Sequence, residues 1–320
     1  MKLFIKNQKL SVRRNQLKTA GYMAIAALFS ILVSCYGSYT KDYDYTAVYF
    51  GTQKPLRTLV ARNDSDYLEF KIGVALGGLR ESTKDYSAQF TVDPTLLNTV
   101  DSASQFTLLP ENLYIIDNPD NTFIIPKGKM LGDCPVKINK TGFTDLPGSL
   151  NKTYALPLRL VSTSADSILS GMDYTIIVIK YISEYSGSYF CRGWEARWNG
   201  SDTTATTSYF YNDLSACKVR QLSTLSLTQF EMIGMGALDD PDNPQITAVD
   251  HLQIGLVDGV VTLSTISGKN PVTDRGSSYN ASTKTFTLNY IYTKGSINYL
   301  VNEELVLRQD VEADLRFETW

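Results

Sequence analysis

The chain has a single histidine, His251, among its 320 residues. Zinc sites in proteins are commonly built from two or three histidines, from cysteine clusters, or from both. The four cysteines include no Cys-x-x-Cys pair and none lies near the histidine in the sequence. The composition therefore excludes a histidine-based zinc centre and indicates no cysteine-based one, and we expect no cofactor.

Long apolar runs are also scarce, and the one that stands out, Ala20 to Val33, is too short to span a bilayer. It follows residues 1–19, which carry six basic residues and no acid, and it ends in Leu32-Val33-Ser34-Cys35. A basic leader, a short apolar run and a small residue before a cysteine are typical of a bacterial lipoprotein signal. We predict that residues 1–34 are removed, that Cys35 is lipidated and that residues 35–43 form a tether. An ordinary buried cysteine ending a signal-anchor helix is the alternative.

The predicted mature chain has no basic excess. The leader takes six of the 30 basic residues, so 24 remain against 33 acids, a formal net charge of −9. This balance argues against a nucleic-acid partner. Membrane attachment then depends on the acyl chains at Cys35. We expect an outer-membrane lipoprotein at the cell surface. Because the first acids after Cys35 are Asp42 and Asp44, the periplasmic face stays open as an alternative.

Helical periodicity is nearly absent from the 286 residues that remain, a length typical of two domains. Leu68, Phe70, Ile72, Val74 and Leu76 alternate with polar residues, as in a half-buried strand. Similar runs follow at residues 86–92, 134–138, 154–160 and 176–179, and only 94–100 favours a helix. We predict an immunoglobulin-like β-sandwich over residues 44–182. Pro135 and Pro157 lie inside two of the runs and predict edge strands.

The second half, residues 183–320, shows a further series of strand patterns. Phe286, Leu288, Tyr290 and Tyr292 alternate, Gly295 supplies a turn, and alternation resumes after it, which is typical of a hairpin. We expect an antiparallel β-barrel of the lipocalin or calycin kind, or else a second sandwich. The whole mature chain is therefore expected to be all-β.

Three cysteines, Cys134, Cys191 and Cys217, remain in the predicted mature chain. An oxidising compartment permits at most one disulfide among them. Cys191 and Cys217 both lie in the second half and form the candidate pair. Three buried thiols are the alternative.

Several strand fragments resemble a known pair of lipoprotein domains. Ala47-Val48-Tyr49-Phe50, Ile124-Ile125-Pro126-Lys127-Gly128 and Tyr154-Ala155-Leu156-Pro157-Leu158 resemble the Bacteroidetes domain of unknown function 1735. Phe286-Thr287-Leu288-Asn289-Tyr290 and Glu304-Leu305-Val306-Leu307-Arg308 resemble the domain of unknown function 4361. The resemblance implies a surface protein of a polysaccharide-utilisation system that works beside a SusC/SusD-type glycan importer.

The same resemblance allows a test for catalysis, because the first domain can precede a chitinase-like glycosidase barrel. Such an enzyme needs several carboxylates along one strand, in a DxxDxDxE pattern. The chain has no such run. Its nearest acidic cluster, which contains Asp239, Asp240 and Asp242, is interrupted by proline. This cluster is a weak calcium candidate because hard cations prefer several oxygen ligands, and a solvated acidic turn is the alternative.

Glycan binding needs flat apolar faces for stacking, together with amides and carboxylates that bond hydroxyl groups. The sequence concentrates such groups in one region, at Trp194, Glu195, Trp198, Asn199, Tyr209 and Tyr211. We expect the tryptophans to stack on sugar rings, with Glu195 or Asn199 as the hydroxyl partner. Alternatively, both tryptophans fill a barrel core, because on a continuous strand they share a face with Ala196.

These observations predict a non-enzymatic lipoprotein that captures glycan for a neighbouring importer. A structural or adhesive lipoprotein that binds a protein partner is the alternative. An accessory glycoside-active protein is a second alternative.

Overall fold

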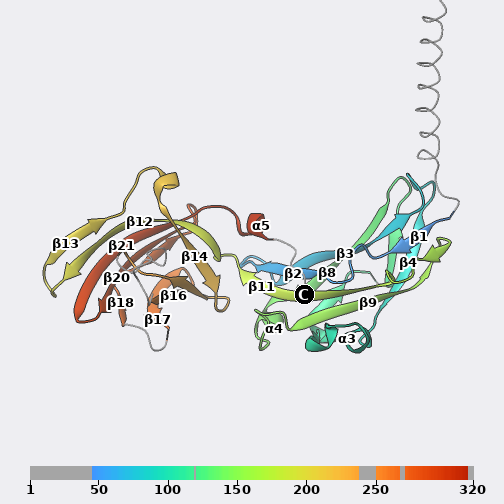
Figure 1. The fold of residues 1–320 in the computed structure, drawn as a ribbon, viewed down its shortest axis with the longest axis horizontal. Coiled ribbons are helices and arrows are strands. Elements are labelled where there is room, and N and C mark those ends of the chain that lie inside the picture. Colours follow the sequence, from blue (N-terminus) through green and yellow to red (C-terminus); the bar gives the residue numbers. More distant parts are fainter. Residues whose placement is uncertain (1–44, 119, 238–249, 267–270, 316–320) are drawn as a thin grey trace, which may run out of the picture.

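The computed structural model describes residues 45–118, 120–237, 250–266 and 271–315. The first part of this chain forms two curled sheets that pack face to face (Figure 1). One has the order β10-β1-β3-β8-β6, and the other has the order β2-β11-β9-β4-β7 with β5 beside β9. Their strands are β1 (Ala47–Tyr49), β2 (Leu56–Ala61), β3 (Tyr67–Gly77), β4 (Tyr86–Val92), β5 (Thr107–Leu108), β6 (Tyr114–Ile116), β7 (Thr122–Ile125), β8 (Leu131–Asn139), β9 (Tyr154–Thr163), β10 (Ser167–Ile168) and β11 (Tyr174–Ser183).

The period-two pattern of the sequence sets the core of this sandwich. Leu68, Ile72, Val74 and Leu76 of β3 are buried, while the intervening Glu69 and Lys71 are exposed. Alternate residues of a strand point to opposite faces of the sheet, so one face of β3 joins the core. The described helices of this domain are short: α3 (Leu96–Thr99), η1 (Ala103–Gln105), η2 (Glu111–Leu113) and α4 (Lys140–Thr144).

Both prolines lie on interior strands, so the prediction of edge strands was wrong. Strand β8 lies between β3 and β6, and β9 lies between β11 and β4. The Pro135 carbonyl accepts from the Asp117 N–H at 2.9 Å, and the Pro157 carbonyl accepts from the Asp93 N–H at 3.1 Å. Asp117 and Asp93 come directly after β6 and β4. Each proline therefore lies where its neighbouring strand has ended, so that the missing N–H breaks no ladder.

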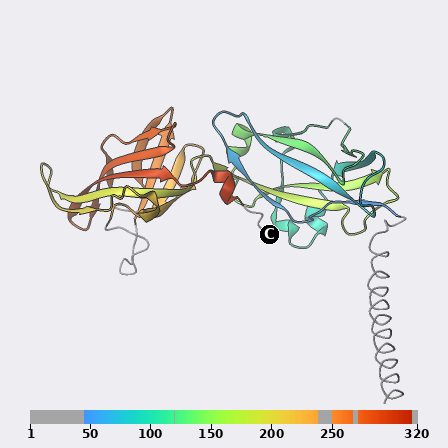
Figure 2. The same cartoon turned by 90° about the horizontal axis from the view of Figure 1, so that it is seen from above.

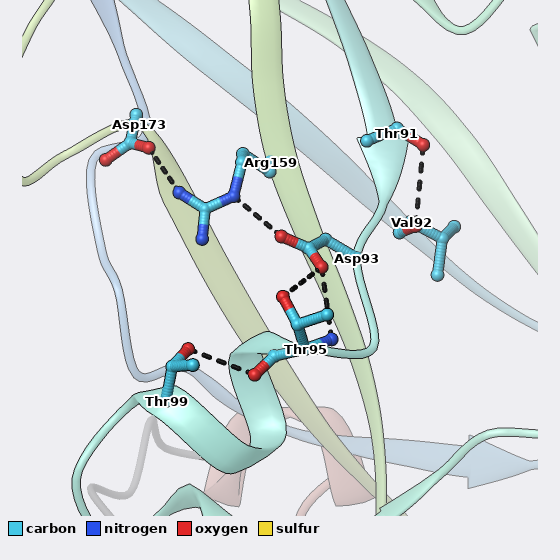
Figure 3. A network of polar contacts seen from close by, with 7 residues as sticks. All are labelled: Thr91, Val92, Asp93, Thr95, Thr99, Arg159 and Asp173. Atoms are coloured by element: carbon cyan, nitrogen blue, oxygen red, sulfur yellow. Dashed lines mark hydrogen bonds and ion pairs between the residues drawn. The ribbon is translucent and has the colours of Figure 1, made fainter.

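A half-buried ion cluster holds the end of β4 against β9 (Figure 3). Arg159 of β9 donates from Nε to Asp93 Oδ2 at 2.7 Å and from Nη1 to Asp173 Oδ2 at 2.6 Å. Asp93 Oδ1 also accepts from the N–H and hydroxyl of Thr95 at the start of α3, at 3.0 and 2.6 Å. Burial alone would raise the pKa of Asp93, but the bonds from Arg159 and Thr95 lower it overall. The carboxylate thus fixes the chain where strand turns to helix.

The second part of the chain is a closed antiparallel barrel rather than a second sandwich. Eight strands form the ring in the order β12-β14-β15-β16-β17-β19-β20-β21, and β21 pairs back with β12. Strand β13 extends from β12, and β18 pairs with β20. The elements are β12 (Gly187–Trp198), β13 (Thr203–Ser208), η3 (Leu214–Ala216), β14 (Lys218–Thr224), β15 (Gln229–Ile233), β16 (His251–Val257), β17 (Val260–Thr265), β18 (Val272–Asp274), β19 (Ser278–Asn280), β20 (Thr285–Lys294), β21 (Ile297–Leu307) and α5 (Val311–Asp314).

The predicted hairpin closes this barrel. Strands β20 and β21 pair over ten residues, from Thr285 opposite Val306 to Lys294 opposite Ile297. Gly295 forms the turn with φ +63°, a left-handed conformation that glycine adopts without a steric penalty. The all-β prediction is confirmed, with a sandwich followed by a barrel.

The two domains meet at a short connection with few direct bonds. The Ser183 N–H at the end of β11 donates to Thr224 Oγ1 of β14 at 2.9 Å. Helix α5 lies between the domains in both views (Figure 1 and Figure 2). Its Glu312 pairs with Arg62 just after β2. Within the described ranges, no helix is long and apolar enough to cross a membrane.

The sandwich core gives a direct stability prediction. Phe123 of β7 is fully buried and stacks on Phe90 with ring centroids 4.5 Å apart. We expect Phe123→Ala to lower the free energy of unfolding by about 3–5 kcal/mol, because a cavity replaces the ring. The neighbouring Ile124 is 52% exposed, so Ile124→Ala is the matched control and should change stability little. Calorimetric melting measures both, and equal shifts for the two variants would contradict the packing described here.

Candidate functional site

Strand β12 presents two different faces because its residues alternate between the barrel interior and the outside. Tyr189, Cys191 and Glu195 are buried with at most 2% of their surface exposed. The intervening outward residues are only partly buried, and they are Phe190, Arg192, Trp194 and Trp198. Alternation along a strand produces this division. The two faces therefore offer two separate candidate sites.

The tryptophans lie on the outer face of the barrel. Trp194 pairs with Asn302 across β21 and Trp198 pairs with Asn298, while the buried Glu303 and Val301 occupy the inward positions of β21. As expected for a continuous strand, both tryptophans share a face with Ala196, which is itself 1% exposed. The alternative that they fill the barrel core was wrong, because this shared face points away from the interior.

The other candidate glycan residues divide between the interior, a turn and an outside loop. Glu195 and Tyr209 are 2% and 7% exposed and lie in the barrel interior, away from the tryptophan face. Asn199 is exposed in the turn after β12, where its Oδ1 accepts from the N–H groups of Ser201 and Asp202 at 3.0 and 2.7 Å. Tyr211 is 50% exposed in the segment after β13. Of the six candidates, only Trp194 and Trp198 therefore share the outward side of β12.

The interior contains a cluster of hydrogen-bonded polar side chains centred on Glu303. This carboxylate is fully buried and accepts from the Tyr290 hydroxyl at 2.7 Å, from the Tyr209 hydroxyl at 2.9 Å and from the Cys191 thiol at 3.4 Å. Burial and then the nearby Glu303 charge raise the pKa values of Tyr209, Tyr290 and Cys191 well above their ordinary ranges. All three groups are thus protonated donors at neutral pH.

A second buried carboxylate, Glu195, is bonded beside this cluster. It accepts from the Tyr292 hydroxyl at 2.8 Å and from the Ala237 N–H at 3.1 Å. The chain after β15 packs directly against it: a Cβ on Gly236, whose φ is +57°, would lie 2.2 Å from Glu195 Oε2. Arg220 of β14 is 2% exposed and donates to the Gly236 carbonyl at 3.2 Å. The interior is therefore a packed, internally bonded cluster whose chemistry is suited to holding the barrel in one arrangement.

The outer face, in contrast, combines aromatic rings with amides. Across β12, β21 and β20, Trp194 lies opposite Asn302, which lies opposite Asn289. Asn302 Nδ2 donates to Asn289 Oδ1, and Thr293 Oγ1 donates to Asn298 Oδ1 at 2.8 Å. Amides held in this way keep further donors and acceptors for a ligand. A sheet face with two indoles and a row of amides is suited to sugar rings.

These asparagines were missed by sequence reasoning, although the sequence contains a signal that locates them. Trp194 and Trp198 were identified by residue type alone. The hairpin turn at Gly295 fixes which residues of β20 and β21 face each other, and counting back from it places Asn289 opposite Asn302. The pairing of β21 with β12 has no local signal, because more than one hundred residues separate Trp194 from Asn302.

The three cysteines that the structure describes, Cys134, Cys191 and Cys217, are free and buried. Cys191 contacts Glu303 in the interior, and the Cys217 thiol lies 3.6 Å from the Asp213 carbonyl near η3. The disulfide between Cys191 and Cys217 is therefore not formed in this structure. The structure has the alternative arrangement, three buried thiols. Burial and then the nearby acids Asp133 and Asp117 raise the pKa of Cys134 to about 11.

Two predicted sites lie outside the described residues, namely the lipidation site Cys35 and the calcium candidate at Asp239, Asp240 and Asp242. Within the described part of the chain, no group of three or more acidic, cysteine or histidine side chains is placed to hold a metal.

Comparisons with known proteins show what the two parts of the chain are similar to. A family model described as "-like, N-terminal domain" matches residues 42–167. No curated protein matches the chain. A solved structure of unknown function from Bacteroides ovatus is 18% identical with a TM-score of 0.68, covering 87% of this chain and 98% of its own.

Two further solved structures have TM-scores of 0.39. A multidomain protein from Bacteroides ovatus that includes the domain of unknown function 1735 is 15% identical over 82% of this chain and 94% of its own. An auxiliary nutrient binding protein from Bacteroides thetaiotaomicron is 13% identical over 81% of this chain and 92% of its own. Residues 42–167, less than half of the chain, are thus similar to the N-terminal domain that the family model describes.

Proposed function

We propose that the mature chain is a non-catalytic, lipid-anchored outer-membrane protein that binds glycan on the outer face of its C-terminal barrel. The observation that carries this proposal is the arrangement of Trp194 and Trp198 on one face of β12, with Asn302 and Asn298 beside them. Four residues of an extended strand span about 13 Å, so each indole can serve a separate sugar ring.

The physical chemistry of sugar recognition supports this assignment. Pyranose rings have apolar faces that pack on aromatic rings, and their hydroxyl groups need amide partners that fix orientation. Rings and amides on a sheet are held by strand pairing, so little conformational freedom is lost on binding.

The placement of the acids supports a binding role over catalysis. Glycosidases need two carboxyl groups that reach the substrate. Glu195 and Glu303 are each at most 2% exposed and are bonded within the barrel interior, away from the tryptophans. On the outer face, Glu304 pairs with Arg192 at 2.8 Å.

The membrane location rests on Cys35 and completes the proposal. Acyl chains on this residue would hold the protein at the outer membrane, at the cell surface or on the periplasmic side. A glycan-binding protein is useful there beside a SusC/SusD-type importer, which is the partner that the resemblance of both domains implies.

A polysaccharide panel tests the proposal with purified residues 36–320 and the double variant Trp194→Ala, Trp198→Ala. Burying an aromatic face is worth about 1–3 kcal/mol, so we expect the variant to bind at least about tenfold more weakly. Tyr67→Ala is the control, because Tyr67 is 39% exposed on β3 of the other domain. Calorimetric titration measures the affinities.

Two outcomes would count against the proposal. Absence of binding across a broad panel of host and plant polysaccharides would refute it. Co-purification of a protein partner that the double tryptophan variant retains equally well would instead favour an adhesive lipoprotein.

A further inference from the structure

Three arginines lie over aromatic rings along the outer face of β12. The Arg308 guanidinium is 5.9 Å from the centre of Phe190, Arg192 is 4.6 Å from the centre of Phe210, and Arg275 is 5.8 Å from the centre of Trp198. Such pairs hold the guanidinium against the ring. We call the three pairs and Trp194 the arginine–aromatic strip.

The strip is built from segments far apart in the sequence, and strand pairing fixes their backbones. The Arg308 N–H, just after β21, donates to the Ser188 carbonyl of β12 at 3.0 Å. The Arg275 N–H, just after β18, donates to the Asn289 carbonyl of β20 at 2.7 Å. Arg275 therefore sits beside the row of Trp194, Asn302 and Asn289 described above.

Two of the three cations on this strip are uncompensated. Arg192 pairs with Glu304, its cross-strand neighbour. Arg275 and Arg308 are exposed and form no ion pair with an acid within the described residues. The nearest acids along the chain are bonded elsewhere: Asp274 accepts from Ser277, and Asp310 pairs with Lys284. A cationic surface in a chain with a mature net charge of −9 is a local feature that composition alone does not produce.

From this strip we infer that the glycan bound by the barrel is acidic, bearing carboxylate or sulfate groups. The inference rests on the proposed glycan function and adds its ligand class. A guanidinium forms paired, charge-assisted hydrogen bonds with a planar carboxylate or with sulfate oxygens. Because each arginine lies over a ring, a sugar that stacks beside it brings an acidic substituent within reach of the cation.

The spacing of the charges favours a glycan over a nucleic acid. Eight residues of strand separate Phe190 from Trp198, which is about 27 Å. Duplex DNA carries about one negative charge per 1.7 Å, far denser than three arginines over this length. A sparsely charged polymer with neutral hydroxyl groups between its anions matches the strip, because amides lie between the cations.

Paired polysaccharides that differ only in charge test the inference on residues 36–320. Polygalacturonate and its methyl ester test carboxylates, and chondroitin sulfate and its desulfated form test sulfates. We expect at least one charged form to bind about tenfold more tightly than its partner, with affinity that falls as salt rises. The pair that shows the difference identifies the anion.

Matched variants test whether the preference for the charged polysaccharide arises from the arginine–aromatic strip. The double variant Arg275→Gln, Arg308→Gln should lose the preference for the charged form while still binding the neutral form. Lys127→Gln, Lys129→Gln removes the same charge from an exposed turn of the sandwich domain and should keep the preference. The tryptophan double variant should weaken binding of both forms.

The other possible results of these binding experiments would overturn either the acidic ligand, the glycan function or both. Equal binding of charged and neutral forms would overturn the acidic ligand and leave the glycan function standing, whereas absence of binding to every polysaccharide would overturn both. Tighter binding of a single-stranded oligonucleotide than of any acidic glycan would assign the strip to nucleic acid. Self-association in sedimentation that the arginine variant abolishes would assign it to a second copy of the chain.

Discussion

Glu303→Ala is expected to lower the free energy of unfolding of the C-terminal barrel by about 3–5 kcal/mol. The change removes a fully buried carboxylate that accepts three hydrogen bonds. The donors Tyr209, Tyr290 and Cys191 then lose this acceptor. Each buried polar group that loses its partner costs about 1–3 kcal/mol, and the missing side chain adds a cavity.

The adjacent residue provides the control. Glu304 points outward, and its carboxylate pairs with Arg192 at the surface. Partly exposed surface pairs of this kind contribute about 1 kcal/mol or less, so Glu304→Ala should change stability much less than Glu303→Ala. Glu303→Gln keeps one acceptor oxygen and should fall between the two alanine variants.

Urea unfolding, monitored by tryptophan fluorescence, measures this loss of stability in the C-terminal barrel domain. All three tryptophans, Trp194, Trp198 and Trp320, follow the domain junction. Equal unfolding midpoints for Glu303→Ala and Glu304→Ala would show that the interior cluster does not stabilise the barrel.

Raising the pH above about 10, the pKa of a free tyrosine, is expected to unfold the barrel. Burial, with neighbouring negative groups, raises the pKa values of Tyr189, Tyr209 and Tyr290 well above that value. It also raises the pKa of Tyr279 to about 12. The folded state keeps these hydroxyls protonated while the unfolded chain releases their protons. Their contribution is therefore fully present below the unfolded pKa and is lost as the pH rises beyond it.

The free energy of unfolding is expected to fall steeply with pH. Each tyrosine that titrates only in the unfolded chain costs about 1.4 kcal/mol per pH unit, so Tyr189, Tyr209 and Tyr290 together cost about 4 kcal/mol per unit. Tyrosinate absorbance and tryptophan fluorescence, followed together through an alkaline titration, measure this loss. Tyr189→Phe removes one titrating group and should make the loss less steep. Stability that stays constant well above pH 10 would contradict the burial described here.

Local patterns in the sequence were sufficient for most of the strands. Alternation at Leu68 to Leu76 reproduces β3, and the run from Phe286 with the turn at Gly295 reproduces the β20–β21 hairpin. These predictions succeed because side-chain alternation and turn chemistry are local properties. The edge-strand prediction for Pro135 failed because the end of a neighbouring strand cannot be read from the proline's own segment.

The candidate site was only partly predictable for the same reason. Residue type selected Trp194 and Trp198, and strand period placed them on one face with Ala196. The strand period could not decide whether that face lies inside or outside the barrel, because the answer depends on which face the neighbouring strands bury. Glu195 and Tyr209 were grouped with the tryptophans because they are close in the chain, yet closure of the barrel turns them inward.

The sequence by itself determined the all-β class, the hairpin and the residue types available for binding, since these follow from local periodicity and composition. Only the tertiary structure decided that a barrel closes through β12 and β21. It also decided that Glu195 and Glu303 enter a bonded interior, and that Arg275 and Arg308 meet aromatic rings outside it. Those contacts join residues far apart along the chain, and pairing between distant strands is a property of the folded backbone that no local pattern specifies.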